Sequence, residues 1–153
     1  MSLFEPVLNH RFQAFFMLGY FPDVLSTRFE RISGLTRQIE VQSFREGGNN
    51  IGSRYLPQGV SFGNLTFERG VMTVSPLTGV FDYIISGFKT SVLSLSVDIM
   101  LMSSRGLPMA TWSVSQALPV RVSIGDFDAN SGNVLIDSME ITCQRIEWLG
   151  VKL

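Results

Sequence analysis

Acidic and amide side chains alternate along one polar stretch of the chain, and this spacing could bind calcium. Asp126, Asp128 and Asn130 place oxygen atoms at every second position, and Asp137 follows further on. Calcium loops also need a glycine at the sixth position, a closing bidentate glutamate and two flanking helices. Ser131 stands where that glycine belongs, and the side chain of Asp137 is too short. We therefore predict a solvated turn over Asp126 to Gly132 and expect no metal site.

A glycine-rich stretch, Glu46 to Asn50, could instead cradle a phosphate group. Phosphate-binding loops continue into a Lys-Ser or Lys-Thr pair and open a helix, because the helix N-terminus and the lysine supply the positive charge. The residues after Asn50 offer neither feature. Nucleotide binding is not expected.

His10 and Cys143 are the sole histidine and the sole cysteine, so catalysis near neutral pH would depend on them or on a perturbed carboxylate. The neighbours of His10 are polar and indicate the start of a surface strand. Cys143 lies in an alternating run, Ile141 to Ile146, that is typical of a small buried thiol. Nothing in the spacing supports a triad, so we expect no catalytic residue, no cofactor and no enzyme. An enzyme on a β-sandwich is the weakest of the alternatives.

The composition indicates one domain, residues 1–153, with surface that a monomer would not expose. Hydrophobic residues make up 45% of the 153 residues and charged residues only 16%, against about 25% charge in typical soluble domains. Burial between subunits explains this shortage of charge. The formal net charge is −1, with Lys and Arg scattered along the chain, so no nucleic-acid partner is expected.

No apolar run approaches the roughly 20 residues of a membrane helix. The stretch Phe12 to Phe21 loosely imitates a secretion signal, but it lacks a leading basic cluster and a small-residue cleavage site. We expect no signal peptide and folding in the cytoplasm.

Period-two patterning predicts a mainly β fold with antiparallel strands. The expected strands are His10 to Leu18, Arg28 to Ser33, Gln38 to Phe44, Val60 to Arg69, Leu93 to Leu101, Pro108 to Val122 with a break at Pro119, and Asn133 to Glu147. One helix is expected after Pro76, since apolar residues recur at helical spacing up to a stop at Gly87.

The strand over residues 93–101 has one apolar and one polar face. Leu93, Leu95, Val97, Ile99 and Leu101 share the first face; Ser94, Ser96 and Asp98 lie on the second. The polar face would suit the aqueous lumen of a ring-shaped barrel built by several subunits, or the solvated outer face of an ordinary sandwich. The alternation fits both.

Residues 45–58 must leave the sheet that flanks them. Gly47, Gly48, Asn49 and Asn50 tolerate positive φ and carry nothing to bury. Such an excursion usually binds something or reaches a neighbour. Arg45 and Glu46 could make charged contacts there, and Glu68 and Arg69 are further candidates.

Several short blocks follow one another along the chain: Phe29, Ile32 to Leu35, Glu40, Phe44 to Asn50, Leu56-Pro57, Leu65, Glu68 to Gly70, Trp112, Ala117 to Val120, Asp126 to Asn133, Glu140 and Ile146 to Leu149. These blocks resemble the phage tail tube family of the T4 type, above all the inner tube proteins of extracellular contractile injection systems. Their order and spacing cover nearly the whole chain.

The resemblance implies a homo-hexameric ring of split-barrel subunits, whose strands join into a lumen-lining barrel and whose rings stack into a tube. It also implies that the loop from Arg45 to Gln58 reaches an adjacent ring or subunit. The implied partners are further tube rings or paralogous tube subunits, spike and baseplate proteins, the sheath, and a protein cargo in the lumen of a particle released from the cell.

The chain departs from the family pattern after the Arg-Gly motif, where Val80 to Tyr83 stands in place of a tryptophan found in many relatives. A repeating tube subunit and an initiator ring next to the spike both stay open. The alternative from another class is a monomeric β-barrel that binds a small apolar ligand, with the aromatic residues between Phe12 and Phe21 as its lining.

Overall fold

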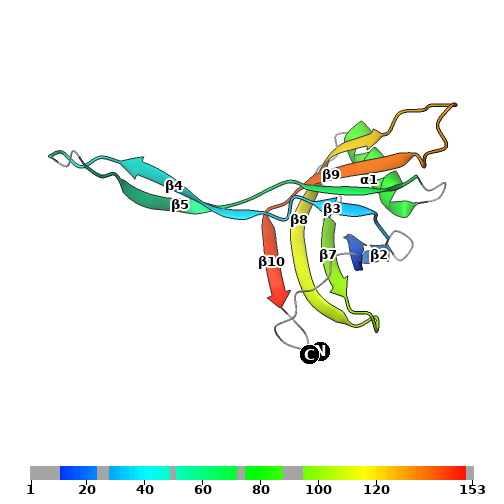
Figure 1. Ribbon diagram of the computed structural model, residues 1–153, viewed down its shortest axis with the longest axis horizontal. Coiled ribbons are helices and arrows are strands. Elements are labelled where there is room, and N and C mark those ends of the chain that lie inside the picture. The colour runs from blue at the N-terminus through cyan, green and yellow to red at the C-terminus, as the bar shows by residue number, and fades with distance from the viewer. Residues whose placement is uncertain (1–10, 24–27, 49–50, 72–74, 88–94, 151–153) are drawn as a thin grey trace.

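The computed structural model describes residues 11–23, 28–48, 51–71, 75–87 and 95–150. Within these segments the chain is mainly β with one helix, as predicted (Figure 1). The strands are β1 Phe12–Leu18, β2 Phe21–Asp23, β3 Arg31–Ser33, β4 Arg37–Phe44, β5 Arg54–Phe62, β6 Leu65–Gly70, β7 Leu95–Met102, β8 Pro108–Ile124, β9 Ile136–Thr142 and β10 Arg145–Gly150, and α1 spans Pro76–Gly87. No helix in the described segments is long and apolar enough to cross a membrane.

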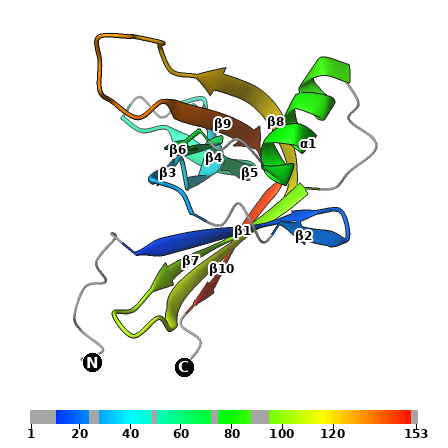
Figure 2. The same cartoon turned by 90° about the vertical axis from the view of Figure 1, so that its right-hand side faces the viewer.

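One antiparallel sheet in the order β2-β1-β7-β8-β9-β6-β3, with β10 also paired to β8, forms the body. The long strand β8 belongs to both halves of this sheet: its first part pairs with β7 and β10, and its last part pairs with β9. The two halves turn across each other at β8, which gives a split barrel (Figure 2).

Irregular backbone in β8 explains how one strand serves both halves. Gln116 adopts a positive φ of 52°, where the pairing with β7 shifts register. A second shift lies between Pro119 and Arg121 in the pairing with β9. Bulges bend and twist a strand, and they accommodate a proline that cannot donate to the ladder. The predicted break at Pro119 is therefore a bulge inside a continuous strand.

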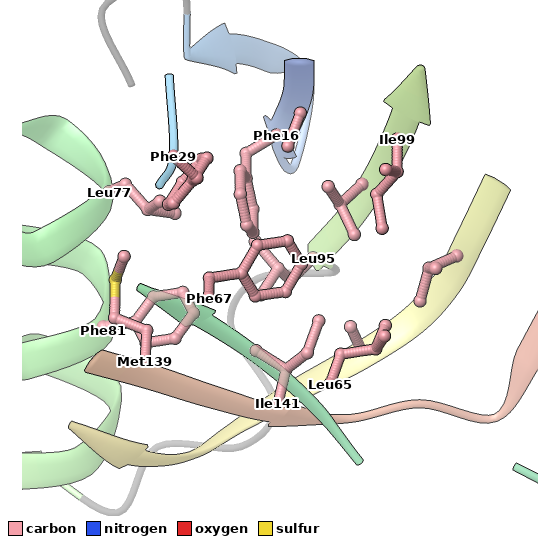
Figure 3. Close-up of a cluster of buried hydrophobic side chains, with 14 of the residues drawn as sticks. Phe16, Phe29, Leu65, Phe67, Leu77, Phe81, Leu95, Ile99, Met139 and Ile141 are labelled. Atoms are coloured by element: carbon pink, nitrogen blue, oxygen red, sulfur yellow. The ribbon is translucent and has the colours of Figure 1, made fainter. Parts of the chain in front are cut away.

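The core lies between the two sheet halves and is covered on one side by α1 (Figure 3). Phe16 lies at its centre, with ring centroids 5.8 Å from Phe29, 5.1 Å from Phe67 and 6.4 Å from Phe81 of the helix. Buried members of the core also include Leu95, Val97 and Ile99, so the predicted apolar face of this strand is confirmed for these residues. Leu93 lies outside the described residues.

The predicted excursion is a long β-hairpin. Strands β4 and β5 form a separate two-stranded sheet that projects far from the body (Figure 1). The chain does leave the sheet of the body here, as predicted. Residues 54–58 of the predicted polar excursion, however, belong to strand β5. The predicted strand Val60 to Arg69 is interrupted at Gly63 and Asn64, where the hairpin joins the body.

Two glycines form the joint between hairpin and body. Gly34 adopts a positive φ of 94°, and a Cβ there would overlap the backbone oxygen of Asn64. A Cβ on Gly63 would overlap the Thr36 hydroxyl oxygen. The amide of Gly63 donates to the carbonyl oxygen of Thr36 at 3.1 Å. The two strands can cross this closely because neither glycine carries a side chain.

The predicted strand Asn133 to Glu147 is also divided. Strand β9 ends at Thr142, and β10 begins at Arg145 and pairs with the other sheet half through β8. The alternation of Met139, Ile141 and Cys143 runs into the break and changes parity before Ile146, a shift of one residue that the predicted continuous strand did not take into account.

Candidate assembly surfaces

The tip of the hairpin carries the predicted contact residues. Arg45, Glu46, Gly47 and Gly48 are all exposed there. The Glu46 carboxylate forms a 2.9 Å ion pair with Arg54 on the opposite strand, so at least one of the two predicted charges already has a partner within the hairpin. Asn49 and Asn50 lie outside the described residues.

One face of the hairpin is an exposed apolar stripe. We define the hairpin stripe as Ile39, Val41, Tyr55, Pro57 and Val60, which share a face because Ile39 pairs with Val60 and Val41 with Pro57. Their exposed fractions include 64% for Ile39 and 68% for Tyr55. The sequence analysis does not predict this stripe, because Pro57 and Gly59 are unusual in a strand and make β5 hard to recognise. The β4 residues of the stripe, Ile39 and Val41, do lie in the alternating pattern of residues 38–44.

The opposite face of the hairpin is mixed and carries the charge. It presents Gln38, Glu40, Gln42, Phe44, Arg54 and Leu56. The side chain of Gln58 donates to the Gln42 amide oxygen at 2.8 Å. The hairpin is therefore amphipathic, with the uncharged stripe on one side.

Arg69 lies in the interior of the subunit, which argues against its predicted role in contact between rings. It is 2% exposed. Its guanidinium donates to the hydroxyls of Ser75 and Thr78, at 2.5 and 2.8 Å, lies 5.4 Å from the ring centroid of Phe29 and faces Asp137, with Nε and Oδ2 3.9 Å apart. The side chain thus ties β6 to the start of α1 and to β9.

Burial dominates the electrostatics of this pair. Desolvation lowers the pKa of Arg69, and the carboxylates of Asp137 and Asp23 oppose that shift. Desolvation likewise raises the pKa of Asp137, and Arg69 and Thr78 oppose it less strongly. A buried carboxyl without a close donor to both oxygens holds its proton more tightly.

Glu68 lies on the outer face of the sheet, opposite Arg31 of β3 and Ser138 of β9. It is half-buried. Of the two additional candidates, Glu68 is the one whose position keeps it accessible to a neighbour.

Ser96 and Asp98 lie on the face of β7 that points away from the core. Ser96 pairs with Met17, and Asp98 pairs with Phe15 and Ser113. Both are half-buried, and Phe15 and Met17 make this face less polar than β7 alone indicates. Ser94 lies outside the described residues.

The polar segment after β8 does not assemble a cation site with Asp137. Asp128 accepts a hydrogen bond from the amide of Asn130 at 2.9 Å, as in a turn, whereas Asp137 is held in the interior near Arg69. Among the described residues no group of three or more His, Cys, Asp or Glu side chains could hold a metal ion. Cys143 is half-buried, and burial raises the pKa of its thiol; His10 lies outside the described residues.

A groove runs beside the base of the hairpin, in the seam between the sheet halves. Its larger part has a volume of about 680 Å³, and a second part of about 270 Å³ continues past Trp148 on β10. Both parts are lined by Leu35 and Trp112. We call this the seam groove. No local pattern in the chain predicts it, since its lining comes from distant segments.

Together these features define a class of protein: a β-rich fold with a projecting hairpin and an open seam, both of which expose apolar residues in the single chain. The chain belongs to the family of the T4-like virus tail tube protein gp19, whose model matches residues 8–147.

Solved structures agree with this family. A chain of the anti-feeding prophage (AFP) baseplate, 6-fold symmetrised, is 44% identical, with a TM-score of 0.88 and 100% of each chain covered. Two chains share the fold at lower identity. One comes from the PVC sheath-tube complex of an extracellular contractile injection system (24% identity, TM-score 0.79, 97% of this chain and 95% of that one). The other comes from the AFP tube terminating cap (20% identity, TM-score 0.78, 99% and 95%). No curated protein sequence matches significantly.

Proposed function

We propose that this tail tube protein forms a homo-hexameric ring at the baseplate end of an extracellular contractile injection system, where it starts the inner tube. The observation that carries this proposal is the gradient of similarity. Identity is 44% over the full length to a chain of a six-fold symmetrised baseplate, and 24% and 20% to chains of a sheath-tube complex and a cap. A repeating tube subunit is the second candidate.

The mechanism is geometric. Each subunit contributes one segment of a ring, the rings stack, and the sheath drives the rigid tube as one body through a target envelope. Closing strands across subunits removes exposed sheet edges, which would otherwise pair without control. Such a role requires no active site, and none is proposed.

The hairpin tip supports stacking in this proposal. Arg45 to Gly48 lie at the far end of a strand pair of eight and nine residues, which reaches about 30 Å at 3.3 Å per residue. That is far enough for the tip to touch an adjacent ring, built either of this chain or of a paralogue. Asn49 and Asn50 belong to the same proposed contact, and Glu68 is a second contact on the body.

The face of β7 with Ser96 and Asp98 is the proposed lumen wall, with Ser94 as a further candidate. A protein cargo would pass along it. The chain would be made in the bacterial cytoplasm and leave the cell within the assembled particle, with spike, baseplate and sheath proteins as partners and no nucleic acid.

A small apolar ligand is not favoured as the function, because the space between the sheet halves is filled. Phe16, Phe29, Phe67 and Phe81 pack against one another there, and the seam groove lies at the surface. The ligand-binding barrel considered from the sequence would hold its ligand inside the barrel, which is the space that these four rings occupy.

Electron microscopy of intact particles tests the assignment to the first ring. A small tag on the exposed turn at Arg105 and Gly106 would be labelled in particles that carry this chain. A single label at the baseplate end supports the initiator ring. Labels along the whole tube would instead assign the chain to the repeating subunit.

A further inference from the structure

The hairpin stripe and the seam groove are two apolar surfaces that one subunit cannot bring together. The hairpin begins at Arg37, two residues after Leu35, which lines the groove. It points away from the body (Figure 1). Folding the stripe back onto its own groove would require breaking the joint at Gly34 and Gly63. Within a single subunit both surfaces therefore stay uncovered.

An isolated two-stranded hairpin is at best marginally stable in water. Every residue of β4, and β5 as far as Val60, is exposed in the single subunit. A hairpin of this length keeps its shape when another surface covers one of its faces. The stripe is the face suited to burial, because it carries no charge between Ile39 and Val60, whereas the opposite face carries Glu40 and Arg54.

The seam groove has the matching chemistry. Its apolar lining comes from both sheet halves: Phe12, Ile32, Leu35, Ile99, Leu101 and Trp112. Glu30, Arg31 and Ser33 line the groove as well. Phe12, Ile99, Leu101 and Trp112 share the face of their half-sheet that points toward the core, because Phe12 pairs with Leu101 and Ile99 with Trp112. The short strand β3, of three residues, leaves this end of the core face open.

We propose that the hairpin stripe of each subunit lies in the seam groove of its neighbour in the same ring. This inference rests on the proposed ring and specifies its contact. The occupant is a second copy because one chain supplies both complementary surfaces at separate places, which produces a head-to-tail contact. Such contacts form a ring when the rotation between copies closes. The six-fold symmetry of the AFP baseplate structure, which contains the 44% identical chain, fits such a contact.

Paired cysteines test the contact directly in the full chain. Leu35→Cys places a thiol on the groove, and Val41→Cys places one on the stripe. The matched control, Leu35→Cys with Gln42→Cys, moves the second thiol by one residue to the opposite face of the same strand. The native chain, with Cys143 half-buried, serves as background. A short bismaleimide cross-linker is applied to rings confirmed by native mass.

The expected result is a ladder of covalent species up to the hexamer for the Leu35→Cys, Val41→Cys chain, and at least fivefold less product for the control. Equal cross-linking of both pairs, or cross-links that form only after rings stack, would overturn the contact while leaving the ring intact. Absence of rings under every condition, including with spike and baseplate proteins added, would count against the proposed function itself.

A second variant covers the case in which the thiols disturb assembly. Val41→Glu places a charge on the exposed stripe without touching the core, so the subunit should fold as before. We expect the proportion of subunits in rings to fall at least tenfold, whereas Gln42→Glu should leave it within twofold. Equal ring formation by both variants would contradict the inference.

Discussion

The guanidinium of Arg69 and the carboxylate of Asp137 face each other in the interior of the subunit, with Nε and Oδ2 3.9 Å apart. Each residue is at least 96% buried. Arg69 also donates to Ser75 and Thr78 at the start of α1. A charged pair therefore holds the single described helix against the sheet.

Removing one member of this pair should destabilise the subunit strongly. Arg69→Ala leaves Asp137 buried without its counter-charge, and breaking such a pair costs about 3 to 5 kcal/mol. Replacing both residues with apolar ones, Arg69→Met with Asp137→Leu, should recover most of that loss. Urea unfolding of the monomer measures the difference. If Arg69→Ala lowers the free energy of unfolding by less than about 1 kcal/mol, the pair does not hold α1 against the sheet.

The pair should also give the subunit a recognisable pH dependence. Since burial raises the pKa of Asp137 in the folded state, the folded chain takes up a proton that the unfolded chain does not, in the window between an ordinary carboxyl pKa of about 4 and the raised value. The contribution of Asp137 to stability therefore increases as pH falls through that window and is lost as pH rises. The native chain should gain stability relative to Asp137→Asn between pH 7 and pH 4. A relative loss would show the opposite shift.

The glycine joint should tolerate no side chain. Gly34→Ala combines a positive φ with overlap against a backbone oxygen, and we expect a loss of about 2 to 4 kcal/mol. Gly59→Ala is the matched control, because a Cβ there meets nothing within 4 Å, and its effect should stay within about 1 kcal/mol. Thermal melts compare the two. Similar melting temperatures would mean that the hairpin can change its angle at no cost.

Charge at the hairpin tip should matter for stacking more than for folding. Arg45→Glu should lower the fraction of rings found in stacks about tenfold, equivalent to about 1.4 kcal/mol per contact, with the melting temperature unchanged. Arg105→Glu, on an exposed turn elsewhere, is the control. Counting rings and stacks in negative-stain images provides the readout. Normal stacking by the Arg45→Glu chain would remove the tip from the proposed interface.

Much of the fold follows from local patterns. Residues 95–101 alternate without interruption, and residues 76–87 repeat at helical spacing after a proline, so strand and helix could both be predicted. The second arm of the hairpin was missed because Pro57 and Gly59 weaken a strand pattern, and pairing with β4 overrides that weakness. Intrinsic strand propensity predicts a strand poorly where pairing with a neighbouring strand determines the backbone conformation.

The candidate surfaces likewise divide into those that local residue types predict and those that depend on contacts between distant segments. The exposed tip at Arg45 to Gly48 could be predicted because glycines and charges mark a turn. The burial of Arg69 could not, since it depends on α1 and on Asp137, 68 residues later in the chain (137 − 69). The seam groove unites residues from distant segments, and no local signal marks such a surface.

Native mass measurement and negative-stain electron microscopy on the same purified sample test the central claim most directly. We expect a hexamer with a central hole, as isolated rings for an initiator or as stacks for a repeating subunit. Spike and baseplate proteins are added if the chain alone is monomeric. A strict monomer at all concentrations, with and without those proteins, would contradict the account.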